Sequence, residues 1–366
     1  MNSPGIASCR LAFTLAFLAI FGVASAQDDS AGVHVRYGEA ALFDPEAGDA
    51  MVADDTNAVA DLKAESQEMP SARVANGVDV VLSNFSEVVK IEFSDARGRH
   101  ACTGVMLSPD AVLTAGHCGC GRAYEVTMQT APVERAGDTA FSILRIEGGP
   151  FLFPGYSCSY PETTGVGHDL ALMRIVPPAA KEGNVFELDD GVAVELSFPV
   201  IRSGVQVLSQ QLLNSIFILG FGRTETGAVA KNLQGANVGV LSRHCIAGHV
   251  FMSYCAPFRE FSLGRNSNTP GIAPDSCGGD SGGPAYRMDS DLIMDPSGLF
   301  PLHLSRRTLV GIVSRAVAGV VHPYRGYCGG GGIYTTVGTR PVLDWLRSQK
   351  VSFLYDPNPT YRAAGG

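Results

Sequence analysis

A serine set among glycines is the strongest indication of chemistry in this sequence. Residues 275–284 read DSCGGDSGGP, and Ser281 is the second serine of that run. A serine hydroxyl is a weak nucleophile until a neighbouring base takes its proton. The glycines leave backbone N–H groups open to an oxyanion that forms on a substrate carbonyl. The run therefore predicts a nucleophilic serine.

Two segments further upstream offer the groups that such a serine needs. His117 lies in the string LTAGHC at 113–118, and Asp169 lies in HDLALM at 168–173. Histidine titrates near neutral pH, so it can accept the serine proton. A buried carboxylate can fix the histidine tautomer and stabilise the imidazolium that forms. The three segments together indicate a hydrolase that acts through an activated serine.

In this order along the chain, the three segments resemble the chymotrypsin/trypsin family of serine endopeptidases. The resemblance implies that Ser281 is the nucleophile, His117 the general base and then acid, and Asp169 the orienting carboxylate. It also implies an oxyanion hole formed by the N–H groups of Gly279 and Ser281. Peptide bonds would be cleaved through an acyl-enzyme, and no cofactor is expected.

Other readings of these residues fit less well. His168 neighbours Asp169, but the family varies at the position before its aspartate, so we interpret His168 as structural. Residues 279–283 also satisfy the Gly-x-Ser-x-Gly pattern of α/β-hydrolases, which order their residues Ser, acid, His. The sequence has no His-Glu-x-x-His string, and the spacing of Cys118 and Cys120 is tighter than in usual zinc pairs. No metal is expected.

Substrate preference is predicted from four positions. Asp275 stands six residues before Ser281 and matches the base of the primary pocket in trypsin-like members. A carboxylate there would pair with an Arg or Lys side chain and reject acidic ones. Gly332 matches a glycine of the pocket wall, and Ser314 and Ala316 match the strand that lines the substrate. We expect cleavage after Arg or Lys, with Arg favoured.

Two departures from the family pattern bear on that preference. The chain reads Ser314-Arg315-Ala316 where the family usually has Ser-Trp-Gly, so a cation replaces an aromatic side chain. Arg315 would either repel a basic substrate or turn toward Asp275, and the methyl group of Ala316 would narrow the pocket mouth. Insertions at 287–307 and 317–327 are either access-restricting loops or plain surface loops. A changed preference and a silent, protein-binding homologue remain the alternatives.

The first 73 residues are expected to form a signal peptide and a pro-segment. Arg10, an apolar run at 11–21 and the string ASA at 24–26 are typical of a signal peptide spanning 1–26. An uncleaved anchor is the alternative, but the run is short for a bilayer span. Residues 27–73 hold 11 acidic and 3 basic residues, which is typical of a solvated pro-segment.

An activation site is expected where the pro-segment ends. Residues 71–77 read SARVANG, and the resemblance implies cleavage between Arg73 and Val74 by an activating protease. Ala75 and Asn76 depart from the usual tetrapeptide. The resemblance also implies that the new α-ammonium group of Val74 pairs with Asp280, a carboxylate that would be costly to bury without a cation.

Nine cysteines become eight when Cys9 leaves with the signal peptide, and an even count in an exported chain indicates disulfides. The sequence alone leaves the pairing open. The family resemblance implies three pairs, and the two cysteines left over would form the fourth. The expected pairs are Cys102–Cys118, Cys245–Cys255, Cys277–Cys328 and Cys120–Cys158.

Composition and pattern predict an all-β protein. The chain of 366 residues has 43 Gly and 17% charged residues, and its net charge of −9 belongs mainly to residues 27–73. A basic face for nucleic acid is therefore not expected. Apolar runs predict strands, and Pro341 with helical spacing after it predicts a helix over 341–346. The strands are expected at 87–93, 103–107, 141–147, 170–175, 216–221, 309–314 and 333–337.

The family resemblance extends this reading to the whole architecture. It implies two antiparallel six-stranded β-barrels, with the catalytic residues in the cleft between them and one C-terminal helix. The protease domain would span 74–350, and the tail 351–366 is expected to be loose. We expect a secreted monomer, extracellular or periplasmic, that meets protein or peptide substrates, an activating protease and protein inhibitors, and that binds neither nucleic acid nor membrane.

Overall fold

The expected signal peptide at 1–26 and pro-segment at 27–73 lie outside the described residues, as do most of the two expected insertions. Within the described ranges, no helix is both long and apolar enough to cross a membrane. The computed structural model describes residues 74, 77–132, 140–161, 165–202, 216–224, 226–243, 245, 255–264, 274–288, 307–317 and 328–356.

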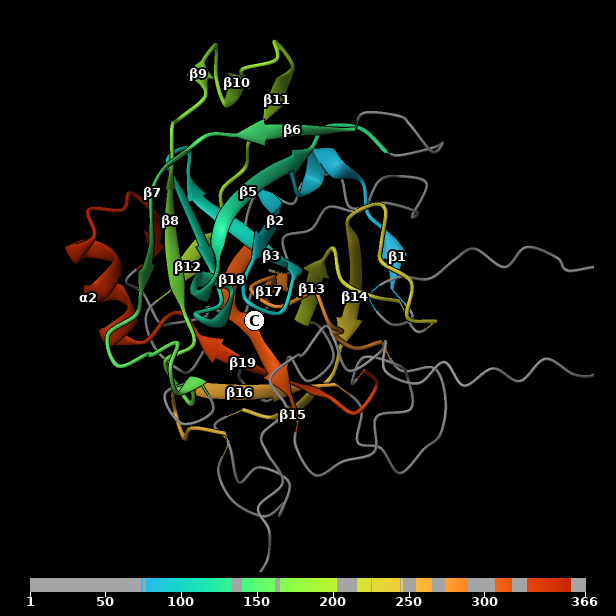
Figure 1. Cartoon of the computed structure of the whole chain (residues 1–366), viewed down its shortest axis with the longest axis vertical. Coiled ribbons are helices and arrows are strands. Elements are labelled where there is room, and N and C mark those ends of the chain that lie inside the picture. The colour runs from blue at the N-terminus through green and yellow to red at the C-terminus, as the bar shows by residue number, and fades with distance from the viewer. Residues whose placement is uncertain are drawn as a thin grey trace, which may run out of the picture. The chain divides into compact units, whose positions relative to one another are not determined.

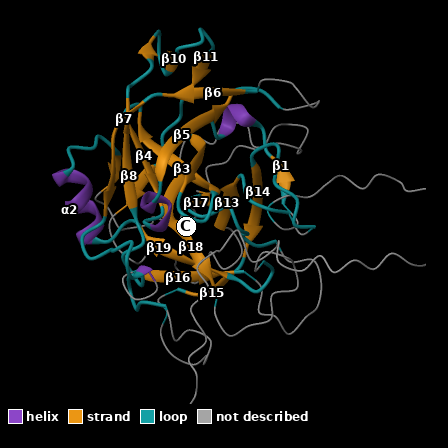
Figure 2. Ribbon diagram, viewed as in Figure 1, coloured by secondary structure: helices purple, strands orange, loops and turns teal. Residues whose placement is uncertain are grey.

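The first sheet carries the segments that contain His117 and Asp169. Its seven described strands follow the order β6-β5-β2-β3-β4-β8-β7, and every pairing is antiparallel. In β2 buried and half-buried residues alternate after two buried valines, as expected for a strand with one face on a core. Figure 2 shows how strands dominate this part of the molecule. The strands are β2 Val88–Ser94, β3 Arg99–Ser108, β4 Ala111–Thr114, β5 Arg122–Gln129, β6 Phe141–Leu144, β7 Ile146–Leu152 and β8 Ala171–Ile175.

The second sheet carries Ser281 and the pocket residues. Eight strands follow the order β1-β14-β13-β17-β18-β19-β16-β15, and β12 and β20 bring the described total to ten. Pairings along this path are antiparallel, whereas β12 pairs parallel with β18 and with β20 (Figure 1). The strands are β1 Val78–Asp79, β12 Val200–Arg202, β13 Ile216–Gly220, β14 Gln234–Val238, β15 Val240–Ser242, β16 Glu260–Leu263, β17 Pro284–Met288, β18 Arg307–Ala316, β19 Gly332–Thr336 and β20 Leu354–Asp356.

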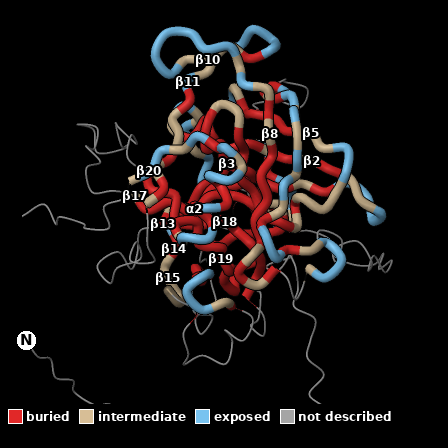
Figure 3. The backbone as a smooth tube through the Cα atoms, turned by 90° about the vertical axis from the view of Figure 1, so that its left-hand side faces the viewer, coloured by how far each residue is buried: buried red, intermediate tan, exposed pale blue. Residues whose placement is uncertain are grey.

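Several strands beside the segments of Asp169 and Ser281 are almost entirely buried. Every residue of β18 and β19 is buried, and so are four of the five residues of β8. Figure 3 shows this buried backbone, in contrast to the exposed turns around β10 and β11. Those two strands form a small separate sheet with β9. The bounds are β9 Ala179–Ala180, β10 Val185–Glu187 and β11 Ala193–Glu195.

The helix predicted over 341–346 is confirmed as α2, Arg340–Ser348. Pro341 stands in its first turn, where a missing backbone N–H costs no intrahelical hydrogen bond. The buried side chains of α2 recur at helical spacing and face the core. They are Val342, Leu343, Trp345 and Leu346.

The expectation of a loose tail from 351 is wrong for its first part. Leu354–Asp356 forms β20 and pairs in parallel with β12, with Val200 opposite Leu354. The physical reason is that β12 offers an edge, which a short extended segment can satisfy with backbone hydrogen bonds. Residues 357–366 lie outside the description.

The predicted all-β architecture with one C-terminal helix is confirmed. The described sheets hold seven and ten strands where six each were expected. One reason is that the run at 141–147 divides into β6 and β7, because the pairing partner changes from β5 to β8. The short edge strands β1, β12 and β20 account for most of the rest. All four expected disulfides are present.

Candidate active site

His117 is the first residue of a short 3-10 helix that follows a strand of the first sheet. This helix, η2, spans His117–Cys120 and follows β4 through Ala115 and Gly116. The Cys102–Cys118 disulfide ties η2 to β3, and the Cys120–Cys158 disulfide ties its other end to the loop before Asp169. Two covalent links therefore hold the backbone that carries the imidazole.

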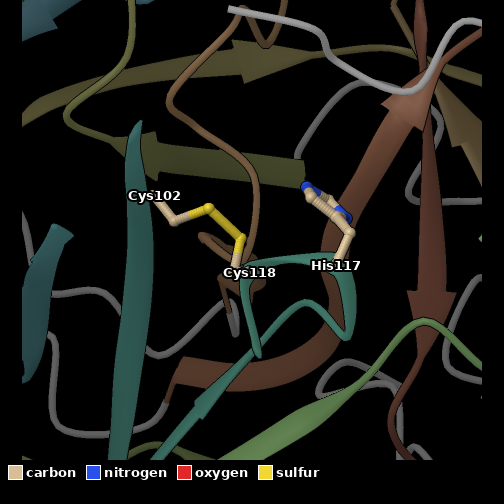
Figure 4. Close-up of side chains that lie close together, drawn as sticks. All are labelled: Cys102, His117 and Cys118. Carbon is tan, nitrogen blue, oxygen red and sulfur yellow. A yellow bond between two sulfur atoms is a disulfide. The ribbon is translucent and has the colours of Figure 1, made fainter. Parts of the chain in front are cut away.

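The Cys102–Cys118 pair and His117 form a compact group of residues with metal-binding side chains. Their sulfur and nitrogen atoms lie within 4.8 Å of one another. Figure 4 shows the sulfurs joined in a disulfide, with the imidazole of His117 standing apart from it. Thiolates are the form of cysteine that ligates metals, and a disulfide contains none. This group therefore cannot act as a thiolate metal site while the disulfide is intact.

Asp169 forms hydrogen bonds with His117 through both carboxylate oxygens. Oδ2 lies 2.9 Å from His117 Nδ1, and Oδ1 accepts the His117 backbone N–H at 2.8 Å. The Ser314 hydroxyl donates to Oδ2 at 2.5 Å. Burial alone would raise the pKa of the Asp169 carboxyl, but the imidazole and these hydrogen bonds outweigh it and hold that pKa below its ordinary value. Because Nδ1–H donates to Asp169, the lone pair of Nε2 is left for another proton.

Ser281 lies on a loop that packs against the segment before His117. Thr103 in β3 donates its backbone N–H to the Ser281 carbonyl at 2.8 Å and its hydroxyl to the Gly279 carbonyl at 2.9 Å. Gly282 has a φ of +81°, and a Cβ added there would lie 2.0 Å from Thr114 Oγ1. Only glycine permits this close approach. The loop therefore holds Ser281 beside the strand that precedes His117.

The two atoms that would exchange a proton are both buried and both lack a partner. Neither the hydroxyl of Ser281 nor Nε2 of His117 has a hydrogen bond among the described residues. Buried polar atoms are normally paired, so an unpaired donor and an unpaired acceptor in one site need an explanation. In catalytic pairs the bond is often long without substrate and tightens when substrate binds.

The loop also presents backbone N–H groups that no described acceptor takes up. The amides of Gly278, Gly279 and Ser281 are in this state, whereas those of Asp280 and Gly282 donate within the protein. Asp280 N–H donates to the Cys277 carbonyl at 3.0 Å, and Gly282 N–H donates to the Val313 carbonyl at 2.8 Å. The amides of Gly279 and Ser281 are also the two that the resemblance assigns to an oxyanion hole.

Asp280 is buried next to Ser281 in the chain, without a cation among its described contacts. Its carboxylate accepts the N–H groups of Gly222 and Cys277, each at 2.8 Å. Added Cβ atoms at Gly220 and Gly222 would lie 2.0 and 2.5 Å from its Oδ1, so glycines shape its niche. Burial, with a smaller contribution from Asp275, raises the pKa of Asp280 to about 7 despite the two amides.

Asp275 lies equally deep and is held entirely by the backbone. Oδ2 accepts the N–H groups of Gly329 and Gly331, and Oδ1 accepts that of Ser276, all at 2.8 Å. Burial raises the pKa of Asp275 to about 7, and these three donors only partly oppose it. A buried carboxylate fixed in this way is ready to pair with a cation that enters from outside.

The expected pocket walls lie in paired strands beside Asp275. Ala316 in β18 is opposite Gly332 in β19, and both are buried. A Cβ added at Gly332 would lie 2.6 Å from the Ser276 hydroxyl. Tyr334 also donates its hydroxyl to Ser276 at 3.2 Å, so the wall is tightly packed. The Ala316 methyl group stands across from the glycine.

Arg315 does not turn toward Asp275. Its guanidinium forms two hydrogen bonds with Glu260 in β16, from Nη1 at 2.7 Å and from Nη2 at 2.8 Å. The alternative in which Arg315 neutralises Asp275 is therefore wrong, and the physical reason is that its guanidinium is already paired with the buried carboxylate of Glu260. Both partners are nearly inaccessible, with 5% and 0% of their side chains exposed.

His168 is engaged on both ring nitrogens. Nδ1 donates to the Val166 carbonyl at 3.0 Å, and Nε2 accepts from Arg259 at 2.7 Å. It cannot serve Ser281 as a base in this arrangement, which supports its structural interpretation. The hollow of about 840 Å³ beside α2 is lined by His168 and Arg259 but by none of the three candidate catalytic residues.

Comparison with known proteins adds to this geometry. The sequence model of the family described as Trypsin matches residues 75–346. The chain belongs to the trypsin family.

The relatives within the trypsin family are distant. Ovochymase from Halocynthia roretzi is 24% identical over 222 residues, which are 59% of this chain and 12% of ovochymase. Proproteinase E from Bos taurus is 26% identical over 223 residues, 59% of this chain and 78% of the relative. A trypsin-like protease from Streptomyces glaucescens is 27% identical over 224 residues, 60% of this chain and 68% of the relative.

Sequence reasoning missed Thr103 and Glu260, on which the trypsin-family site rests here. Thr103 anchors the serine loop from the other sheet, and Glu260 takes the guanidinium of Arg315. An acidic residue at the start of the apolar segment 260–263 was the available signal for Glu260, since charged residues are almost never buried without a partner. Its partner stands 55 residues away, and no local pattern points to it.

Proposed function

We propose that this protein is a secreted serine endopeptidase that cleaves after Arg or Lys through His117, Asp169 and Ser281. The observation that carries the proposal is the pair of hydrogen bonds from His117 to Asp169, beside a buried Ser281 hydroxyl with no described partner. The remaining features are consistent with the same chemistry. Membership of the trypsin family supports the reaction class.

In the proposed reaction Ser281 Oγ attacks the carbonyl carbon of the substrate peptide bond. His117 Nε2 takes the hydroxyl proton, and Asp169 stabilises the imidazolium. The amides of Gly279 and Ser281 stabilise the oxyanion, and losing one such donor typically costs about 3 kcal/mol of transition-state stabilisation. His117 then protonates the leaving amine, and the amine departs. A water molecule, deprotonated by His117, hydrolyses the acyl-enzyme and frees Ser281.

Asp275 is proposed to set the preference for Arg or Lys. The desolvated carboxylate is costly to ionise alone, and a guanidinium or ammonium from the substrate would relieve that cost. Arg315 is held by Glu260 and so does not compete for Asp275. The Ala316 methyl group narrows the pocket mouth, which favours a slender side chain.

Activation is proposed to follow cleavage between Arg73 and Val74. Val74 is fully buried in the apolar cluster that includes Ile216 and Ile218. Its φ of +56° is a strained value for a β-branched residue. Cutting the peptide bond removes the preceding carbonyl and with it this strain. The freed α-ammonium would provide the cation that Asp280 lacks.

Export is proposed from the disulfides and the expected leader. Four disulfides are typical of chains that fold in an oxidising compartment. The protein would act as a monomer on protein or peptide substrates, after an activating protease has cut between Arg73 and Val74, and protein inhibitors would compete for its cleft.

The experiment combines three measurements on one preparation. After treatment with an Arg-specific protease, N-terminal sequencing should read Val74-Ala75-Asn76, and a fluorophosphonate should then label the wild type but not Ser281→Ala. A peptide library should show Arg or Lys before the cut bond. Absence of labelling would instead favour a silent homologue, and cleavage without a basic residue would remove the specificity assignment.

A further inference from the structure

A polar network from the second sheet reaches the carboxylate of Asp169. The Glu260 carboxylate binds Arg315, Arg315 Nη1 donates to the Ser314 hydroxyl at 3.0 Å, and that hydroxyl donates to Asp169 Oδ2 at 2.5 Å. The Ser314 hydroxyl has one proton and two lone pairs. With a donor held on one side, its proton is directed to Asp169.

An irregularity in β18 makes this arrangement possible. Neighbouring residues of a regular strand point to opposite faces. The register between β18 and β19 shifts between Val313 and Arg315, which leaves Ser314 as the extra residue of a bulge. A bulge redirects a side chain locally. Ser314 and Arg315 can therefore meet each other beside Asp169.

Glu260 holds the Asp169 segment by a second route. Its Oε1 accepts the backbone N–H of Gly167 at 2.8 Å, two residues before Asp169, and its Oε2 accepts that of Ala256 at 2.7 Å. Gly167 packs closely there, since an added Cβ would lie 2.9 Å from the Ala256 Cβ. The carboxylate of Glu260 thus fixes the backbone before Asp169 while its partner Arg315 fixes the hydroxyl that binds the Asp169 side chain.

We propose that the Glu260–Arg315 ion pair is a positioning element for the triad carboxylate, acting on Asp169 through the Ser314 hydroxyl and the Gly167 backbone. The proposal rests on the proposed function of Asp169. Because the two charges cancel at close range, the pair acts by direction of hydrogen bonds and not by adding net charge near His117. Neither residue touches the substrate in this role.

A matched ion pair joins Arg307 of β18 to Glu87, the residue before β2, and makes no described contact with Asp169. Arg307 donates from Nε to Glu87 at 2.9 Å and from Nη2 to the other oxygen at 2.5 Å, with 2% and 0% of the two side chains exposed. It therefore shares the burial and the two-point geometry of the Glu260–Arg315 pair. Loss of either pair should lower stability, but only one should change the geometry of His117 and Asp169.

The test replaces both charges of each pair, which avoids leaving a lone buried charge. The variants are Glu260→Gln with Arg315→Met, and the control Glu87→Gln with Arg307→Met. The amide oxygen that Glu260→Gln introduces can still accept the Gly167 N–H. In the activated enzyme we expect the first variant to lower kcat about tenfold, the value of one well-placed hydrogen bond, with KM changed less than about twofold. The control should lower the melting temperature comparably and leave kcat within about twofold.

Two readouts separate positioning from general loss of structure. The proton on His117 Nδ1, shared with Asp169, gives a low-field NMR resonance that should shift or broaden in the first variant and stay in place in the control. Ser314→Ala should by itself lower kcat, and adding Glu260→Gln/Arg315→Met to it should cost little more, because the two act through one hydroxyl.

Three outcomes would overturn the proposal. The first is an unchanged resonance and kcat in the Glu260/Arg315 variant. The second is an equal loss of kcat in the Glu87/Arg307 control. The third is a combined variant whose fold-loss in kcat equals the product of the fold-losses of Ser314→Ala and of the Glu260/Arg315 variant. If the wild type hydrolyses nothing and Ser281 resists labelling, the proposed function fails, and the NMR comparison still decides whether the ion pair positions Asp169.

Discussion

Asp169 and His117 are joined by two hydrogen bonds, one to the ring at 2.9 Å and one to the backbone at 2.8 Å. The hydrogen bond to Nδ1 sets which ring nitrogen carries the proton. The hydrogen bond from the backbone N–H fixes the position of the main chain from which the imidazole projects. One carboxylate therefore determines both the tautomer and the location of the imidazole. The consequences of this and of three other features are open to measurement.

Asp169→Asn should nearly abolish turnover while leaving the fold intact. An amide at this position can stabilise the wrong tautomer and cannot stabilise an imidazolium, and such a change typically lowers kcat about ten-thousandfold. Active-site titration and kcat on an arginyl amide substrate measure the effect. Asp110→Asn removes the negative charge that faces Arg174 and serves as the control. Retention of a tenth of wild-type kcat by Asp169→Asn would contradict the assigned role.

Binding of an amidine inhibitor should weaken as the pH falls through about 7. The raised pKa of Asp275 means that its carboxyl is mostly protonated at pH 5, and a cation binds only the ionised form. Each pH unit below the pKa costs tenfold, so affinity at pH 5 should be roughly a hundredfold lower than at pH 8. Calorimetry near pH 7 should register proton release on binding.

The control for that measurement is Asp275→Asn, which should bind the amidine weakly at every pH. A neutral aromatic ligand should show no comparable pH slope on the wild type. A pH-independent amidine affinity in the wild type would show that Asp275 is not the group the cation meets.

The uncleaved chain should lose stability as the pH rises from about 4 to about 7, in part through Asp280. The pKa of Asp280 is about 7 in the folded protein and 3.8 for an ordinary aspartate, so the folded state binds the proton more tightly than the unfolded state. Stability falls with pH wherever the folded state holds more protons, by about 1.4 kcal/mol for each unit of pKa difference at most. Urea unfolding at pH 4.5 and 7.5, with disulfides intact, measures the difference.

Asp280→Asn should flatten that slope in the uncleaved chain. After cleavage at Arg73 a paired α-ammonium would lower the pKa of Asp280, so the same substitution should then destabilise at neutral pH. If the wild type and Asp280→Asn show the same pH dependence before cleavage, the buried carboxyl is not the cause.

Gly282→Ala should remove activity and destabilise the fold. The new Cβ would meet Thr114 Oγ1 at 2.0 Å and the Thr103 carbonyl at 2.2 Å, and backbone cannot move aside as a flexible side chain can. A loss of about 2–3 kcal/mol of stability is expected from the strain and the displaced loop. Thermal unfolding and kcat both report it.

Gly183→Ala is a matched control for Gly282→Ala. Gly183 also has a positive φ, +66°, yet a Cβ there meets nothing within 4 Å. Only the backbone preference is then lost, about 1 kcal/mol. Equal damage from both substitutions would mean that contact with the His117 segment is not what Gly282 provides.

The sequence predicted those parts of the molecule that depend on short local patterns. Ser281, His117 and Asp169 each stand in a distinctive string, and the structure brings Asp169 to His117 and the serine loop against Thr114. The all-β class and α2 followed from alternation and from helical spacing. The exact strand ends did not, because pairing partners decide where a strand begins and ends.

The parts that could not be predicted depend on register between distant segments. Glu260 and Arg315 meet because β16 and β18 both flank β19 and because β18 contains a bulge. Neither the strand order nor the bulge can be recognised from a local sequence pattern. Arg315 was seen as a departure from the family pattern, but its partner could be identified only once the strands were in place.

The last described strand has a consequence for how this protein can be shortened. β20 covers β12 by parallel pairing at residues 354–356, four residues past the domain end that the sequence suggests. A chain stopped at residue 350 would leave bare those backbone donors and acceptors of Val200–Arg202 that face β20, while the pairing of β12 with β18 would remain. Uncovered strand edges invite pairing with other molecules. Self-association of the shortened protein would therefore arise from trimming, with the loops that carry His117, Asp169 and Ser281 untouched.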